Sequence, residues 1–333
     1  MNNMNIDCII CRNATGRILE HKDKPIITYC SHCFHMMELT KTTDDYSKIE
    51  SFIRLEHSFL VNRPGTKLLL TNTNSTNNSI ITQFPSNFTI IDYTHLLNTN
   101  VNTTSTAPQQ FDFIIIPFVF NMIRNPHALL QNILTYMSEK TEIYLYLKYF
   151  TSPEDRVFGI LKEAIVSDFS TNSLKMLCNK NGLELDSVTF LDTFHNYAIF
   201  KLTKLISQDS NVVYYLVDEL ETNLYDVESY NQLRYHLTIC RNLLENVILH
   251  FRCQGYTVVD CCSDEWIKLY GLSYLIHNTT VTFPYIQSGS NLLLIYNKSN
   301  VLDVWQKLSQ LFLTHTGKLE LLNTSTLSLY CVN

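Results

Sequence analysis

The sequence predicts an α/β fold, in which helices cover a parallel sheet, preceded by a small metal-binding module. Short runs that are apolar throughout alternate with segments whose apolar residues recur at helical spacing, which is typical of parallel strands buried on both faces. Four cysteines in the first 33 residues form two CxxC motifs. With 333 residues, 45% of them apolar, the chain is long enough for two domains besides this module.

The two CxxC motifs carry the sharpest chemical signal. Their cysteines are Cys8, Cys11, Cys30 and Cys33, with 18 residues between the motifs. Each motif can present two thiolates from one turn, and two turns complete the tetrahedral S₄ set that Zn²⁺ prefers. We predict a structural zinc site, because four protein ligands leave no open position. His32 and His35 are weaker candidate ligands, and two unrelated pairs of buried thiols are the alternative.

The first alternation of strands and helices spans residues 63–150. Four strands are expected in one parallel sheet, at 67–70, 88–91, 111–116 and 142–147. Apolar residues from Leu129 to Met137 recur at helical spacing and predict a helix before the fourth strand. No strand is expected in the Asn/Thr-rich loop at 98–110.

A second cycle begins near residue 212 and predicts a smaller Rossmann-like lobe. One face of a long helix carries Leu233, Leu237, Leu244, Ile248 and Phe251. The expected elements after it are strands at 256–260, 280–285 and 291–296, helices at 264–276 and 300–314, and a closing strand pair at 318–322 and 327–331.

The net charge and the cysteines limit which binding partners and which cellular compartment we expect. The net charge is −6 and no dense Lys/Arg run occurs, so nucleic acid is not an expected partner. No run of about 18 apolar residues and no apolar signal segment occurs, so we expect neither a membrane span nor secretion. The scattered cysteines then predict reduced thiols and a cytoplasmic location.

Three segments of the chain resemble those of a known family. They are residues 26–39 around the second CxxC motif, residues 111–130 around the third strand, and residues 169–183. The family is that of the deoxysugar C-methyltransferases, which use S-adenosylmethionine (SAM) to methylate a carbon of a nucleotide-linked keto sugar. The resemblance covers nearly the whole chain. It implies a zinc-binding module at 1–45, a class I methyltransferase (Rossmann-like) core at 63–204 and a Rossmann-like lobe at 211–333.

The resemblance also implies a SAM site at the carboxyl ends of the first strands. Thr71 and Asn72 would contact the methionine end, Asp92 would bind the ribose hydroxyls, and Pro117 would begin the wall around adenine and the methyl group. The family's turn after strand one is Gly-rich, because only residues without Cβ let the backbone approach the cofactor closely. Residues 71–77 contain no glycine. An ordinary solvent-exposed acid is the alternative interpretation of Asp92.

The catalytic motifs depart from the family as well. Its Tyr-His-Glu-His cluster aligns with residues 162–165 and its His-Gly-Gly-Ser segment with residues 195–198. Glu163 and His195 are therefore the candidate general base and substrate contact, with plain surface positions as the alternative. The small-residue turn of the last lobe aligns with residues 262–266, which lack the family's lysine.

Two functions from different classes follow from these observations. The first is an active SAM-dependent methyltransferase with a small-molecule, nucleotide-sugar acceptor. The second is a catalytically inactive relative, a pseudoenzyme that serves as a binding or scaffold component for a protein partner. We expect the zinc module to lie far from the chemistry, so that chelation unfolds residues 1–45 before it affects the core.

Overall fold

The computed structural model divides the chain into two compact units. Unit 1 comprises Met1–Glu20 and Pro25–Asn231, and unit 2 comprises His21–Lys24 and Gln232–Asn333. The residues described are 6–21, 24–39, 63–71, 88–98, 109–162, 165–190, 197–205, 207–260, 291–296, 319–323 and 328–332. The elements predicted at 264–276, 280–285 and 300–314 lie outside them.

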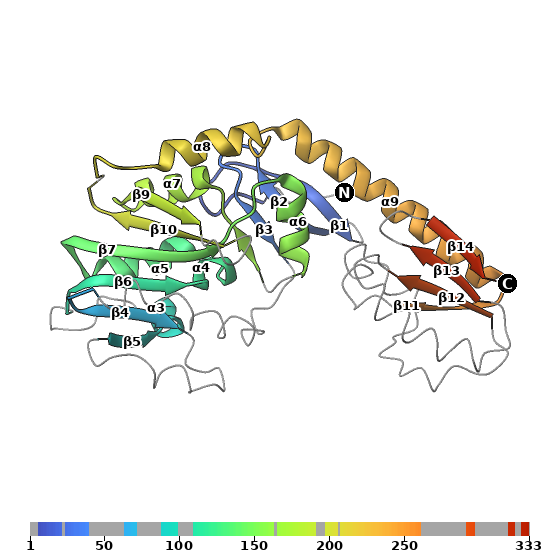
Figure 1. Ribbon diagram of the computed structural model, residues 1–333, viewed down its shortest axis with the longest axis horizontal. Coiled ribbons are helices and arrows are strands. Elements are labelled where there is room, and N and C mark those ends of the chain that lie inside the picture. Colours follow the sequence, from blue (N-terminus) through green and yellow to red (C-terminus); the bar gives the residue numbers. More distant parts are fainter. Residues whose placement is uncertain are drawn as a thin grey trace. The chain divides into compact units, whose positions relative to one another are not determined.

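Unit 1 is built on a six-stranded sheet with the order β5-β4-β6-β7-β10-β9 (Figure 1). The strands are β4 (Lys67–Thr71), β5 (Phe88–Asp92), β6 (Phe111–Pro117), β7 (Met137–Lys148), β9 (Glu184–Phe190) and β10 (Tyr197–Thr203). Strands β5, β4, β6 and β7 are parallel neighbours, whereas β10 is antiparallel to β7 and β9. The predicted parallel sheet is confirmed, and it forms the centre of an α/β fold with one antiparallel strand in its order.

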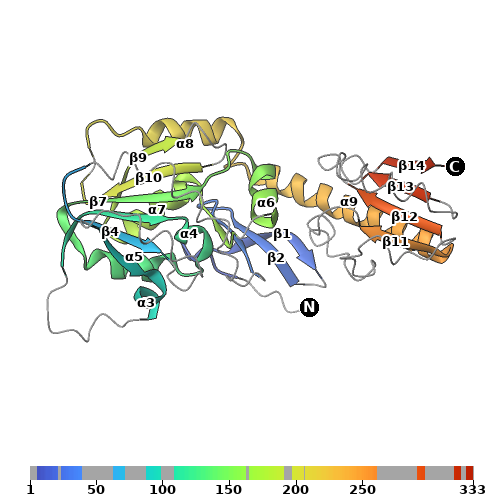
Figure 2. The same ribbon diagram turned by 60° about the horizontal axis from the view of Figure 1, so that its bottom comes forward.

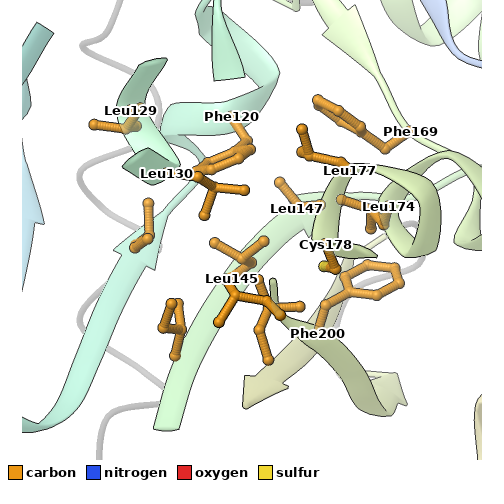
Figure 3. Close-up of a cluster of buried hydrophobic side chains, with 14 of the residues drawn as sticks. Phe120, Leu129, Leu130, Leu145, Leu147, Phe169, Leu174, Leu177, Cys178 and Phe200 are labelled. Atoms are coloured by element: carbon orange, nitrogen blue, oxygen red, sulfur yellow. The ribbon is translucent and has the colours of Figure 1, made fainter. Parts of the chain in front are cut away.

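One face of the sheet packs against helices α5 (Pro126–Leu134) and α7 (Thr171–Lys180). Figure 3 shows leucines of both helices meeting Leu145, Leu147 and Phe200 of the sheet. The residues that form this contact are fully buried, and their apolar area supplies the main stabilising term of the core.

The helix predicted from Leu129 onward is present, but its predicted end is wrong. Helix α5 ends at Leu134, and Met137 is the first residue of β7, not part of the helix. Strand β7 therefore begins five residues before the expected Glu142. The polar residues from Ser138 to Thr141 hid this start, although Thr141 is buried and donates a hydrogen bond to the carbonyl of Phe111 at 2.6 Å.

A second sheet of unit 1, with the order β1-β2-β3-β8, adjoins the CxxC motifs, and Cys30 is the last residue of its strand β2. Its strands are β1 (Thr15–His21), β2 (Lys24–Cys30), β3 (Met36–Glu38) and β8 (Ser167–Asp168). The edge strand β8 comes from the chain between helix α6 (Pro153–Lys162) and α7, and Met36 pairs with Asp168. The N-terminal module and the core thus share a sheet.

A buried ion pair joins this sheet to α6. The Arg156 guanidinium donates through Nε to Asp168 Oδ2, through Nη2 to the Asp168 carbonyl at 3.2 Å, and through Nη1 to the Tyr230 hydroxyl at 2.9 Å. Both charged side chains are fully buried. Burial raises the pKa of Asp168 to about 6, and the nearby Arg156 offsets part of that rise. Asp168 Oδ1 has no hydrogen-bond partner.

Unit 2 contains most of the long helix α9 (Val227–Cys253) and a sheet with the order β11-β12-β13-β14. The strands are β11 (Tyr256–Asp260), β12 (Asn291–Tyr296), β13 (Leu319–Asn323) and β14 (Ser328–Val332). The first three are parallel, and β14 is antiparallel to β13. All five apolar residues predicted on one face of α9 are buried. Among the helices described, none is long and apolar enough to cross a bilayer.

We expect Arg156→Met to destabilise unit 1 by roughly 3–5 kcal/mol, because it leaves the Asp168 carboxylate buried without its cation. The matched control Tyr230→Phe removes one hydroxyl contact of the same guanidinium and should cost about 1 kcal/mol. Urea unfolding monitored by circular dichroism measures both. Equal losses in the two variants would show that the ion pair is not the stabilising element.

Candidate metal centre and cofactor site

The four predicted cysteines come together in unit 1. Their Sγ atoms all lie within 4.8 Å of one another, with Cys8 and Cys33 3.5 Å apart and Cys11 and Cys30 3.3 Å apart. A tetrahedral zinc ion with Zn–S bonds of about 2.3 Å holds its sulfurs about 3.8 Å apart. The four thiols are free. This donor set therefore fits a Zn²⁺ ion.

Both CxxC motifs form the same turn. The residue after the second cysteine, Arg12 in one motif and Phe34 in the other, has a positive φ of 68° or 60°. Its N–H donates to the carbonyl of the first cysteine, at 2.9 Å in the first motif and 2.8 Å in the second. In both motifs the N–H two residues after the first cysteine points at that cysteine's Sγ from 3.4 Å. Such amides stabilise thiolates, so the backbone is arranged for a metal ligand.

The thiols of the cluster lie close enough to shift one another's pKa values. Contacts with Cys33 and then Cys8 hold the pKa of Cys30 far below its ordinary value. Contacts with Cys30 raise the pKa of Cys8 to about 12 and push that of Cys33 higher still. Metal binding requires cysteine ligands to be deprotonated, so a bound divalent ion would displace the protons of the thiols that ligate it.

The two flanking histidines do not join the ligand cluster. His32 is exposed, whereas His35 is buried and its ring packs 4.9 Å from that of Phe169. Burial lowers the pKa of His35 to about 3. Within the described part of the chain, the ligand atoms that lie together are the four thiol sulfurs. The preference for cysteines over histidines agrees with this geometry.

The metal loops, which are the two loops that carry the CxxC motifs, are hydrogen-bonded to both ends of α7. Ser170, the N-cap of α7, donates its hydroxyl to the Cys33 carbonyl at 3.1 Å. Lys180, in the last turn, donates to the Ile10 carbonyl at 2.8 Å, and His127 Nε2 donates to the same oxygen at 3.2 Å. Three of the cysteines also lie in the buried cluster of the core. These contacts do not agree with the expectation that residues 1–45 unfold before the core when the metal is removed.

Two of the predicted cofactor residues are neighbours at the carboxyl edge of the sheet. Thr71 and Asp92 are register partners at the ends of β4 and β5. Pro117 ends β6, which pairs with the opposite side of β4. The ends of three parallel strands thus lie together, where open α/β sheets bind ligands. Asn72, Glu163 and His195 lie outside the described residues.

Asp92 has a structural role that the sequence did not reveal. Its side chain caps helix α3 (Tyr93–Asn98), because Oδ1 accepts hydrogen bonds from the Thr94 N–H at 2.8 Å and from the Thr94 hydroxyl at 2.7 Å. With 5% exposure it is not the solvent-exposed acid of the alternative interpretation. The Asp-x-Thr spacing could have indicated this cap.

The end of β6 holds a strained aromatic residue that sequence reasoning missed. Phe118 has a φ of 56°, and its buried ring packs edge-on against Tyr197 at 5.2 Å. Lys148, at the end of β7, places Nζ 3.9 Å from the centre of the same tyrosine ring. Strain of this kind clusters at ligand sites, and no sequence signal marks a positive φ in phenylalanine.

Comparisons with known proteins find solved structures that resemble part of this chain at low sequence identity. No protein-family model and no curated protein sequence matches the chain. A solved SAM-dependent methyltransferase from Thermotoga maritima, described as a possible histamine N-methyltransferase, is 13% identical, with 47% of this chain and 92% of that chain covered and a TM-score of 0.35. A structure described as a pericyclic reaction enzyme is 17% identical, with 46% and 39% covered and a TM-score of 0.34.

A third structure of this kind is CalO1, a methyltransferase in calicheamicin biosynthesis, at 11% identity, with 42% of each chain covered and a TM-score of 0.30. The chain spans about 39% of the pericyclic reaction enzyme's length. Likenesses with TM-scores this low carry no argument about activity. The fold assignment rests instead on the strand order and directions of unit 1.

We expect purified protein to contain about one zinc ion per chain, and Cys8→Ser to lower both the metal content and the melting temperature. The control Cys253→Ser changes an exposed thiol outside the cluster and should alter neither. Because the metal loops bond to α7, chelation should lower the melting temperature of unit 1 in one transition. Elemental analysis and thermal melts measure this, and a metal-free protein of unchanged stability would contradict it.

We expect Asp92→Ala to cost about 1 kcal/mol of stability without any ligand, because α3 loses its cap. Asp92→Asn keeps an acceptor for Thr94 and should cost clearly less. Urea unfolding of the two variants tests the cap. Equal losses would mean that the carboxylate charge, not the hydrogen bonds to Thr94, stabilises this strand end.

Proposed function

We propose that the chain is a divergent SAM-dependent methyltransferase whose acceptor is a nucleotide-linked sugar and whose zinc centre is structural. The pairing of Thr71 with Asp92, at the carboxyl ends of adjacent parallel strands, carries this proposal. A buried carboxylate at that position suits a ligand with a pair of neighbouring hydroxyls, because charged acceptors make the stronger hydrogen bonds.

The roles proposed for the residues are those that the resemblance to the methyltransferase family implies. Asp92 binds the ribose, Thr71 and Asn72 lie against the methionine end, and Pro117 borders the adenine. SAM, when bound, supplies an electrophilic methyl group. In this proposal Glu163 and His195 serve as base and substrate contact, and residues 211–333 form the lobe that takes the acceptor.

An inactive, methyltransferase-like binding protein is the second candidate. The absence of glycine from residues 71–77 favours it, because side chains there occupy space that a cofactor needs. The cap also favours it, since Asp92 Oδ1 already accepts two hydrogen bonds from Thr94. Both observations predict weak SAM binding even if the protein is an enzyme.

We expect millimolar SAM to raise the melting temperature of the wild-type protein, because even a dissociation constant of about 1 mM is detectable by mass action. Asp92→Asn should abolish the rise while keeping the cap, since a hydrogen bond to a charged group contributes roughly 1.5–3 kcal/mol. Titration calorimetry with SAM gives the affinities. A wild-type protein that shows neither heat nor a thermal shift would decide for the inactive binding protein.

A further inference from the structure

Helix α8 (Val212–Glu221) turns an apolar face to solvent. Its inner residues Tyr215 and Leu216 pack against the core of unit 1. Figure 1 and Figure 2 both place α8 along an edge of that unit, over β9 and α7. The exposed apolar residues of α8 are Val213 (68%), Tyr214 (80%), Val217 (48%) and Leu220 (60%).

The residues of this outer face form one stripe. Val213, Val217 and Leu220 follow one another at the i, i+4, i+7 spacing that places side chains on one side of a helix, and Tyr214 lies beside them. Scattered surface apolar residues need no explanation, but contiguous exposed patches mark interaction sites. Helix-mediated recognition uses apolar anchors at this spacing.

The rim of the stripe is acidic. Asp218 and Glu221 are exposed and lie one helical turn after Tyr214 and Val217. Three further exposed acids lie close by in the chain, namely Asp209, Asp226 and Glu228. Residues 205–228 contain no lysine, arginine or histidine. An apolar centre with a rim of a single charge sign selects a partner of the opposite charge.

We propose that the outer face of α8 docks another protein through an amphipathic segment with apolar anchors and Lys/Arg flanks. A second copy of this chain is disfavoured, because identical faces would place acids against acids. Anionic membranes are disfavoured for the same reason. This proposal does not depend on SAM binding. If the protein is an inactive binding protein, the outer face of α8 is the surface that it uses.

A fluorescent amphipathic Leu/Lys helical peptide is the probe, and fluorescence anisotropy with the full chain measures its affinity. We expect the Leu/Lys peptide to bind and a charge-reversed Leu/Glu peptide not to bind. The double variant Val217→Ser, Leu220→Ser should weaken binding at least about tenfold. Asp218→Asn with Glu221→Gln should weaken it several-fold and reduce its salt dependence.

The matched control is Leu249→Ser, which removes an exposed apolar side chain of α9 and should leave binding unchanged. All these side chains are exposed, so thermal melts should match the wild type. Unchanged peptide binding by the Val217/Leu220 variant would overturn the proposal. Two other results would overturn it. If the wild type binds phosphatidylserine vesicles and the variant does not, the occupant is a membrane. If the wild type forms a dimer in sedimentation and the variant does not, the occupant is a second copy of the chain.

Discussion

The anchoring of α7 by the metal loops is the constraint on which unit 1 depends. Ser170 and Lys180 bind backbone carbonyls of the two CxxC loops from opposite ends of the helix. The same helix buries Leu174 and Leu177 against the central sheet. A metal ion that fixes the loops therefore fixes one layer of the core. The cysteine cluster is thus part of the domain's packing, not an appended module.

The sequence predicted the elements whose signals are local. Strands β4, β5 and β6 are apolar on both faces and were found within one residue of their predicted ends, and the CxxC spacing predicted the sulfur cluster. It could not predict pairings between distant segments, such as Met36 with Asp168. Nor could it show that Phe118 adopts a positive φ, because neighbouring structure decides that conformation.

Under the proposed function, Asp92 would serve two purposes at the end of its strand. Oδ1 stabilises the start of α3, and that cap also fixes the side chain where the strand ends meet. A fixed acceptor loses less entropy on ligand binding than a mobile one. The cost is that one oxygen already has two donors, so the ligand competes for the remaining acceptor capacity. Weak binding and a preorganised site are thus compatible at this position.

The buried side chain of Glu219 attaches helix α8 to the core of unit 1. It is fully buried, and its Oε1 accepts from the Tyr149 hydroxyl and, at 2.7 Å, from the Thr171 N–H at the start of α7. A carboxylate at a helix N-terminus is favoured by the helix dipole. The metal loops hold α7, and the first turn of α7 holds α8 through Glu219. The apolar face of α8 is therefore carried on a rigid support, which limits the entropy that a docking partner must overcome.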